Sequence, residues 1–310
     1  MRLVDQNVPG PRRDFVGYGR RLPKVVWPND AKVAVNLIVN YEEGSEYSIP
    51  AGDNRNEGLA EIPYVMPGEQ RDLNAESIYE FGARAGSMRL LRLFDEYGVR
   101  VTFYAAAVAV ERNPEVGEWI RESGHEPAAH GWRWIDPWTL DRDEERRHIE
   151  WAVRSLEETC GERPVGWFSR YSASAYTREL LVEEGGFIYD SDAFADDLPY
   201  FTEVSGKRHL IVPYTLVYND GRYVLPQGFS SPSDFFETCK CGLDELLREG
   251  RAGYPKMMSV GLHPRWSGQA ARTSGLRRFI EYALEQGDVW FARRDEIARW
   301  WIDHHEEFQR

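Results

Sequence analysis

Apolar runs typical of buried strands alternate along the chain with longer segments whose apolar residues recur at helical spacing. Helix-start signals at Asn113-Pro114, Asp141 and Ser231 mark three of the helices. We predict strands at 33–40, 99–107, 125–130, 164–168, 187–189, 257–262 and 289–292, and a β-rich stretch at 208–228. We predict helices at about 75–97, 114–123, 142–160, 174–184, 232–249, 271–286 and from 293 onward. This alternation predicts a parallel sheet, and seven or eight such units favour an α/β fold, a distorted (β/α)7–8 barrel.

Two segments lie outside this alternation. Residues 1–30 are rich in Pro, Gly and Arg and are predicted to form an N-terminal arm, which leaves 31–310 as a single barrel domain. Residues 44–74 form a long loop rich in Gly, Pro and Asn. Long loops in compact domains are usually functional, so we expect this one to cover a pocket or to form a subunit contact.

Polar side chains follow the apolar runs at five points. Glu42 and Glu43 end the first run, and the later runs end at His130, Arg170, Asp190–Asp192 and His263. The carboxyl ends of parallel strands in a barrel point to one rim, where loops gather distant residues. The pattern therefore predicts one active site built from residues more than 200 positions apart.

Four of these residues are candidates for acid–base chemistry. Glu42 is the candidate general base, whereas Glu43 has a purely structural ion pair as its alternative role. His130 ends its strand at the predicted rim, while His125 begins the same strand and is expected to be structural. His263 is followed by a proline and is placed to protonate a leaving nitrogen.

The remaining candidates have open alternatives. Trp132 and Trp134 either line a substrate pocket or fill a core or interface. Arg170 offers a planar fork for a carbonyl or ureido oxygen, or it pairs with a carboxylate such as Asp192 or Glu42. The acidic stretch 190–197 is conceivable as a divalent-metal site, but one functional residue, Asp192, with loop-capping neighbours is favoured.

Composition narrows the class of partner. The net charge is −13 and no basic block is present, which disfavours nucleic acid and anionic membranes as partners. Three cysteines without a disulfide pattern, together with an N-terminus that lacks an apolar signal region, favour a cytoplasmic protein. No nucleotide-binding glycine motif is present, so no cofactor is expected.

The order of motifs resembles the polysaccharide deacetylase superfamily, and within it the allantoinase-like branch that uses no metal. The resemblance runs from about Asp14 to Phe308. It rests on 13–19, 40–44 (Asn-Tyr-Glu-Glu-Gly), 130–136 (His-Gly-Trp-Arg-Trp-Ile-Asp), 183–192, 196–200, 212–216 and 290–294.

The resemblance implies roles for individual residues. Deacetylases of the family place an Asp-Asp pair, one base and one metal ligand, where this chain has Glu42 and Glu43. Their paired metal histidines match His130 and Trp134, so the second histidine ligand is missing, and we expect metal-free chemistry or at most a weak ion site. Their late catalytic histidine matches His263. Allantoinase-like members carry a Cys directly after that histidine and an Arg five residues further on, whereas this chain has Pro264 and Gln269. These departures leave the substrate in question.

The sequence thus predicts a hydrolase of non-peptide C–N bonds that opens a small cyclic ureide or imide. Glu42, His130, His263 and Asp192 are the expected catalytic residues. The expected substrate-binding residues are Glu43, Trp132, Trp134, Arg170 and Arg265. The alternatives are a metal-dependent deacetylase of N-acetylated sugar polymers and a non-catalytic binding protein with the same barrel. The resemblance also implies a homotetramer.

Overall fold

The computed structural model describes residues 9–62, 64 and 66–308. Its centre is a sheet whose strands run in the order β6-β7-β5-β4-β3-β2-β1-β8, with β9 also paired to β1. All pairings are parallel except that of β6 with β7. The strands are β1 Val33–Tyr41, β2 Thr102–Ala105, β3 Glu126–Ala129, β4 Gly166–Trp167, β5 Tyr189–Asp190, β6 Tyr200–Val204, β7 Lys207–Ile211, β8 Lys256–Leu262 and β9 Val289–Phe291. The predicted α/β barrel is confirmed.

The sheet curls into a distorted barrel that irregular segments help to complete. Beyond β8, the backbone of residue 219 bridges to Gly261, and the amide of Met257 donates to the carbonyl of Asp197. These contacts cover the side of β8 that no regular strand pairs with in the described part of the chain.

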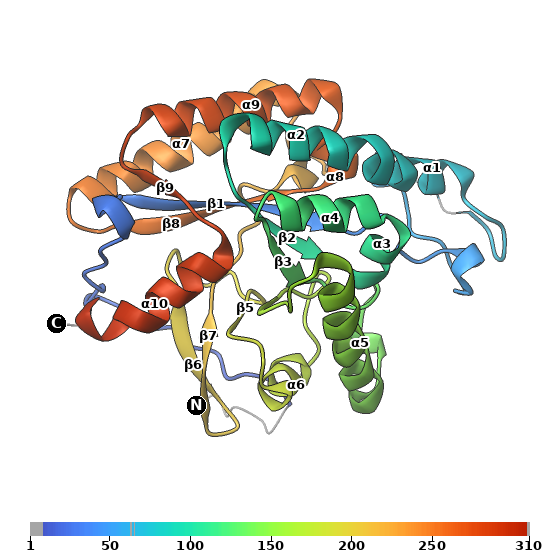
Figure 1. The fold of residues 1–310 in the computed structure, drawn as a ribbon, viewed down its shortest axis with the longest axis horizontal. Coiled ribbons are helices and arrows are strands. Elements are labelled where there is room, and N and C mark those ends of the chain that lie inside the picture. Colours follow the sequence, from blue (N-terminus) through green and yellow to red (C-terminus); the bar gives the residue numbers. More distant parts are fainter. Residues whose placement is uncertain (1–8, 63, 65, 309–310) are drawn as a thin grey trace, which may run out of the picture.

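Helices cover the outside of the sheet (Figure 1). α7 and α9 lie side by side across β1 and β8, α3, α4 and α5 cover β2 and β3, and α10 ends the described chain. The helices are α1 Leu73–Phe81, α2 Ser87–Tyr97, α3 Ala107–Arg112, α4 Pro114–Glu122, α5 Arg142–Cys160, α6 Thr177–Glu184, α7 Pro232–Arg251, α8 Pro264–Ser267, α9 Ala270–Glu285 and α10 Arg294–Phe308. A π-helical segment, Gly82–Gly86, joins α1 to α2.

The alternation of side chains along β1 decides what reaches the barrel interior. Every residue of β1 is buried, because helices cover one face and the barrel encloses the other. Val33, Val35, Leu37, Val39 and Tyr41 pack in the helix-facing core, whereas Ala34 and Ile38 belong to the interior cluster. By the same alternation, Asn36 and Asn40 lie on the interior side of the strand, and Glu42 lies on that side just beyond its carboxyl end.

Two predicted elements differ from the structure. The sequence predicts a β-rich stretch at 208–228, but the strand there ends at Ile211 and its hairpin partner lies earlier, at Tyr200–Val204. Asp220–Tyr223 is a short 3-10 helix. The predicted strand 99–107 ends at Ala105, and α3 follows at once. The alternating Ala and Val residues of α3 fit a strand pattern as well as a buried helix.

Candidate active site

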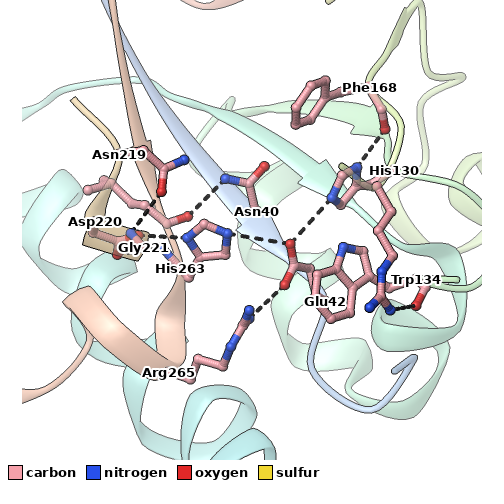
Figure 2. Close-up of polar contacts among 12 residues, drawn as sticks. Asn40, Glu42, His130, Trp134, Phe168, Asn219, Asp220, Gly221, His263 and Arg265 are labelled. Carbon is pink, nitrogen blue, oxygen red and sulfur yellow. Dashed lines mark hydrogen bonds and ion pairs between the residues drawn. The ribbon is translucent and has the colours of Figure 1, made fainter. Parts of the chain in front are cut away.

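Glu42 stands at the centre of a buried polar cluster (Figure 2). Its Oε1 atom is 3.4 Å from Nε2 of His130 and 3.5 Å from Nε2 of His263. Its Oε2 atom is 2.7 Å from Nη1 of Arg265. The side chain is only 2% exposed, so these three groups replace water around the carboxylate. Residues from the ends of β1, β3 and β8 therefore meet at one rim.

His263 is oriented by a residue that sequence reasoning missed. Asp220 lies 2.6 Å from Nδ1 of His263, and its other oxygen accepts the backbone N–H groups of His263 and Ser267. Asp220 comes from the irregular segment that bridges to β8. The signal in the sequence was Asn219-Asp220-Gly221, a polar turn within a stretch interpreted as strand.

His130 is held by the backbone of the neighbouring strand. Its Nδ1 lies 2.5 Å from the carbonyl oxygen of Phe168, and the two rings stack with centroids 5.3 Å apart. A carbonyl oxygen only accepts, so Nδ1 carries the hydrogen and Nε2 faces Glu42. The carbonyl of Phe168 thus fixes the direction of the ring and turns Nε2 toward Glu42.

The contacts within the cluster lower the pKa of Glu42 and raise the pKa of His263. Burial alone raises the pKa of Glu42, but the charges of Arg265 and His263 and the bond from His130 outweigh it and hold that pKa well below the usual value. Burial alone lowers the pKa of His263, but the charges of Glu42 and Asp220 raise it to about 9. At neutral pH the carboxylate is therefore ionised and the imidazole of His263 is protonated.

Glu43 faces away from the barrel interior, as the alternation of a strand requires. Its carboxylate accepts the backbone N–H groups of Glu42 and Arg265 and lies against Gly82, where a Cβ atom would meet it at 2.6 Å. Burial, and then the charge of Glu42, raise the pKa of Glu43 to about 7 although Arg265 opposes them. Glu43 is predicted to bind substrate; the structure shows it joining β1 to α8 instead.

Trp134 and Arg170 lie against each other beside the cluster. The guanidinium of Arg170 stacks 3.8 Å from the indole centroid and donates to the backbone carbonyl of Trp134. It also pairs with Glu57 at 2.8 Å and with Asp136 at 3.1 Å. The expected partners Asp192 and Glu42 are therefore not its partners; Arg170 holds the 44–74 loop through Glu57.

A small cavity of about 50 Å³ lies beside Arg265. Tyr79, Trp134 and Trp266 form aromatic walls, and Arg265 is the cation among its described lining residues. Residues 57–61 of the long loop line the same cavity. Aromatic walls around a few polar groups are typical of small-molecule sites.

Two predicted site residues, Asp192 and Trp132, do not line the cavity beside Arg265. Asp192 accepts the backbone N–H and the hydroxyl of Ser169, and burial together with the charge of Asp190 raises its pKa to about 7. No hydrogen bond or ion pair within the described residues joins it to Glu42. Trp132 packs against His148 and Trp151 on the α5 side. Asp192 thus supports the segment next to His130, and Trp132 is not part of the cavity beside Arg265.

The donor set does not fit a catalytic zinc ion. Such an ion normally takes three protein ligands. Here one oxygen of Glu42 is paired with Arg265, Glu43 faces away, and Trp134 offers no ligand atom. Within residues 9–62, 64 and 66–308, no three His, Cys, Asp or Glu side chains form a metal-binding group.

Comparison with known proteins shows relatives along nearly the whole chain. A polysaccharide deacetylase profile matches residues 76–186. A Schizosaccharomyces pombe protein assigned to the polysaccharide deacetylases is 34% identical over 94% of this chain and 98% of its own length. The chain belongs to the polysaccharide deacetylase family.

Two solved structures with this family's fold have a higher sequence identity to the chain than the Schizosaccharomyces pombe protein has. A probable polysaccharide deacetylase from Pseudomonas aeruginosa is 45% identical, with a TM-score of 0.89 over 95% of this chain and 98% of that one. The PuuE allantoinase is 44% identical, with a TM-score of 0.89 over 94% and 98%. The chain is therefore a hydrolase-family member, with an allantoinase among its similar structures. No helix in the described part of the chain has the length and apolar character needed to cross a bilayer.

Proposed function

We propose that the protein hydrolyses a C–N bond in a small cyclic ureide or imide without a metal. The observation that carries this proposal is the placement of two imidazoles on one carboxylate oxygen, Oε1 of Glu42. Glu42 can act as the base and His263 as the acid at this one place. Such a pair suits the addition of water to a carbonyl, followed by protonation of the leaving nitrogen.

Glu42 and His263 already hold the protonation states that the reaction requires. A water molecule at Oε1 of Glu42 loses a proton to that carboxylate while its oxygen bonds to the ring carbonyl carbon. His130 orients the water through Nε2. The C–N bond then breaks, and His263 transfers its Nε2 proton to the departing nitrogen. Its pKa of about 9 keeps His263 protonated before this step.

The substrate class rests on the cavity and on one similar structure. The cavity has a volume of about 50 Å³ and aromatic rings form part of its wall, so it suits a small ring better than an extended sugar chain. The PuuE allantoinase, with 44% identity, is named for a reaction of a cyclic ureide. Arg170 is assigned no role at the substrate carbonyl, because Glu57, Asp136 and the carbonyl of Trp134 already occupy its guanidinium.

Deacetylation of an N-acetylated sugar remains a second candidate because of the family match. It would need a metal ligand set that this chain's residues do not offer. Metal content of the purified protein, with activity measured before and after chelation, separates the two candidates.

The test is hydrolysis of hydantoin, dihydrouracil, succinimide and allantoin, with products identified by mass spectrometry. We expect ring opening by the wild type and a loss of about 10²–10⁴-fold in Glu42→Gln and in His263→Gln. Glu96→Gln, which changes an exposed carboxylate, is the matched control and should keep full activity. Undiminished turnover in both site variants would refute these roles.

A further inference from the structure

Arg265 occupies the first turn of α8, directly after β8 and His263. Its backbone N–H donates to Glu43, and its Nη1 lies 2.7 Å from Glu42 and 3.5 Å from Glu43. Its side chain is 3% exposed. A buried cation is therefore fixed beside the carboxylate that is proposed to take the proton of water.

Only part of the guanidinium is used by these contacts. All its polar contacts to the described residues run through Nη1. The rings of Trp266, Tyr79 and Trp134 lie 4.3, 4.8 and 5.4 Å from its central carbon. Guanidinium carries five N–H donors in one plane. Aromatic rings around it leave the edges of that plane for hydrogen bonds.

The cavity lies next to this group. Arg265 lines it together with Tyr79, Trp134 and Trp266, and the other charged residues of the described lining are Glu57 and Glu61. A substrate carbonyl in this cavity thus meets one positive group. Arg170, the alternative donor on sequence grounds, is already ion-paired to Glu57 and Asp136.

We propose that Arg265 is a catalytic residue whose guanidinium binds the substrate carbonyl oxygen and carries its negative charge after water adds. This inference rests on the proposed hydrolysis. Before attack, Arg265 faces the Glu42 carboxylate and a neutral carbonyl. In the addition step the water proton moves to Glu42, the new C–O bond forms, and the carbonyl π electrons move to oxygen.

The charge beside Arg265 is conserved through this step. Glu42 becomes neutral as the oxyanion forms, so the negative charge passes from one neighbour of the guanidinium to another. When the C–N bond breaks, the oxyanion returns to a carbonyl and His263 supplies the proton to nitrogen. The cation is fixed in place beforehand, which is how enzymes stabilise developing charge at low reorganisation cost.

The test compares Arg265→Gln, Arg265→Lys and Arg265→Ala with Arg277→Gln, which removes a surface guanidinium paired with Glu96. We expect Arg265→Gln to lower kcat by about 10²–10³-fold with little change in KM. Added guanidinium ion should restore part of the activity of Arg265→Ala. The acid limb of the pH profile should move to higher pH, because Glu42 loses its cationic partner.

Outcomes separate this inference from the proposed function. If the wild type opens none of the rings, the proposed function fails, and this role fails with it. If the wild type is active but kcat of Arg265→Gln stays near wild type, or the loss lies in KM alone, only the role of Arg265 is overturned. Should Gln and Ala variants not fold, Arg265→Lys decides: it keeps the charge but not the fork, and wild-type kcat in it would overturn the proposal.

Discussion

At the scale of single residues, Oε1 of Glu42 is the atom on which the site depends. His130 is directed at it by the carbonyl of Phe168, and His263 is directed at it by Asp220. Both imidazoles are therefore oriented by acceptors that lie behind them. This arrangement explains how residues from three strands keep one geometry.

The ionisation of His263 yields a pH prediction. Its pKa of about 9 lies above the usual value, so kcat/KM should fall about tenfold per pH unit above about pH 9. Asp220→Asn removes an anion that favours the imidazolium, so the basic limb should move to lower pH. The check is kcat/KM against pH for both proteins. A basic limb that does not move in the variant contradicts the role of Asp220.

Sequence reasoning found the residues that directly follow regular strands. Glu42 follows β1, His130 follows β3 and His263 follows β8, and each is near the shared rim because parallel strands place their carboxyl ends together. Asp220 was missed because it comes from an irregular segment that no periodicity marks. Arg170 was found, but its partner Glu57 lies in a loop whose path the sequence does not predict.

At the scale of elements, the long loop is fastened beside the site. Arg170 pairs with Glu57, Arg133 with Asp53, and Arg55 with Asp136. Glu57 belongs to the part of the loop that lines the cavity. The cavity of about 50 Å³ is smaller than the roughly 150 Å³ that holds benzene in an engineered core. We therefore propose that residues 57–61 move when a ring enters.

Loosening this loop should change binding more than chemistry. Glu57→Gln removes one of the two anionic partners of Arg170, the one that lies in the loop. We therefore expect faster amide hydrogen exchange in residues 46–61 and a KM raised about 3–10-fold, as a loss of about 1 kcal/mol in closure implies. Glu69→Gln, an exposed change in the same loop, is the control. Unchanged exchange and KM in Glu57→Gln would show that the pair does not hold the loop.

Close backbone contact sets the position of α8. A Cβ atom on Gly86, in the π-helical segment, would lie 2.1 Å from the carbonyl oxygen of Pro264. Gly86→Ala should therefore lower the free energy of unfolding by about 1–3 kcal/mol, because backbone must shift. It should also disturb Arg265. Thermal or denaturant unfolding measures the effect, with the exposed neighbour Arg84→Ala as control. Equal stability of the two variants contradicts this close packing.

At the scale of the whole molecule, the alternation of strands and helices predicted the barrel but not its irregular half. The runs that became β1 and β8 are long and apolar, and both were predicted. β4 and β5 are only two residues long in the structure, and the hairpin of β6 and β7 lies earlier than its apolar pattern indicated. The pattern of apolar and polar side chains does not determine where such short strands begin and end. The homotetramer and the cytoplasmic location stay predictions.

Metal removal tests the molecule as a whole. Because the site offers too few ligands for a catalytic zinc ion, ring opening by wild-type protein should be unchanged after chelation and dialysis. Turnover and metal content are measured on the same sample. Activity that disappears with chelation and returns with added Zn²⁺ would contradict metal-free chemistry and favour the deacetylase alternative.

The central claim is that Glu42 and His263 act as one acid–base unit. The most direct measurement is a double-mutant cycle of kcat on a ring that the wild type opens, with Glu42→Gln, His263→Gln and the double variant. Residues that act as a unit give non-additive losses. We predict that the double variant loses about as much as the more damaged single variant. Losses that multiply, or a single variant with wild-type kcat, would contradict the account.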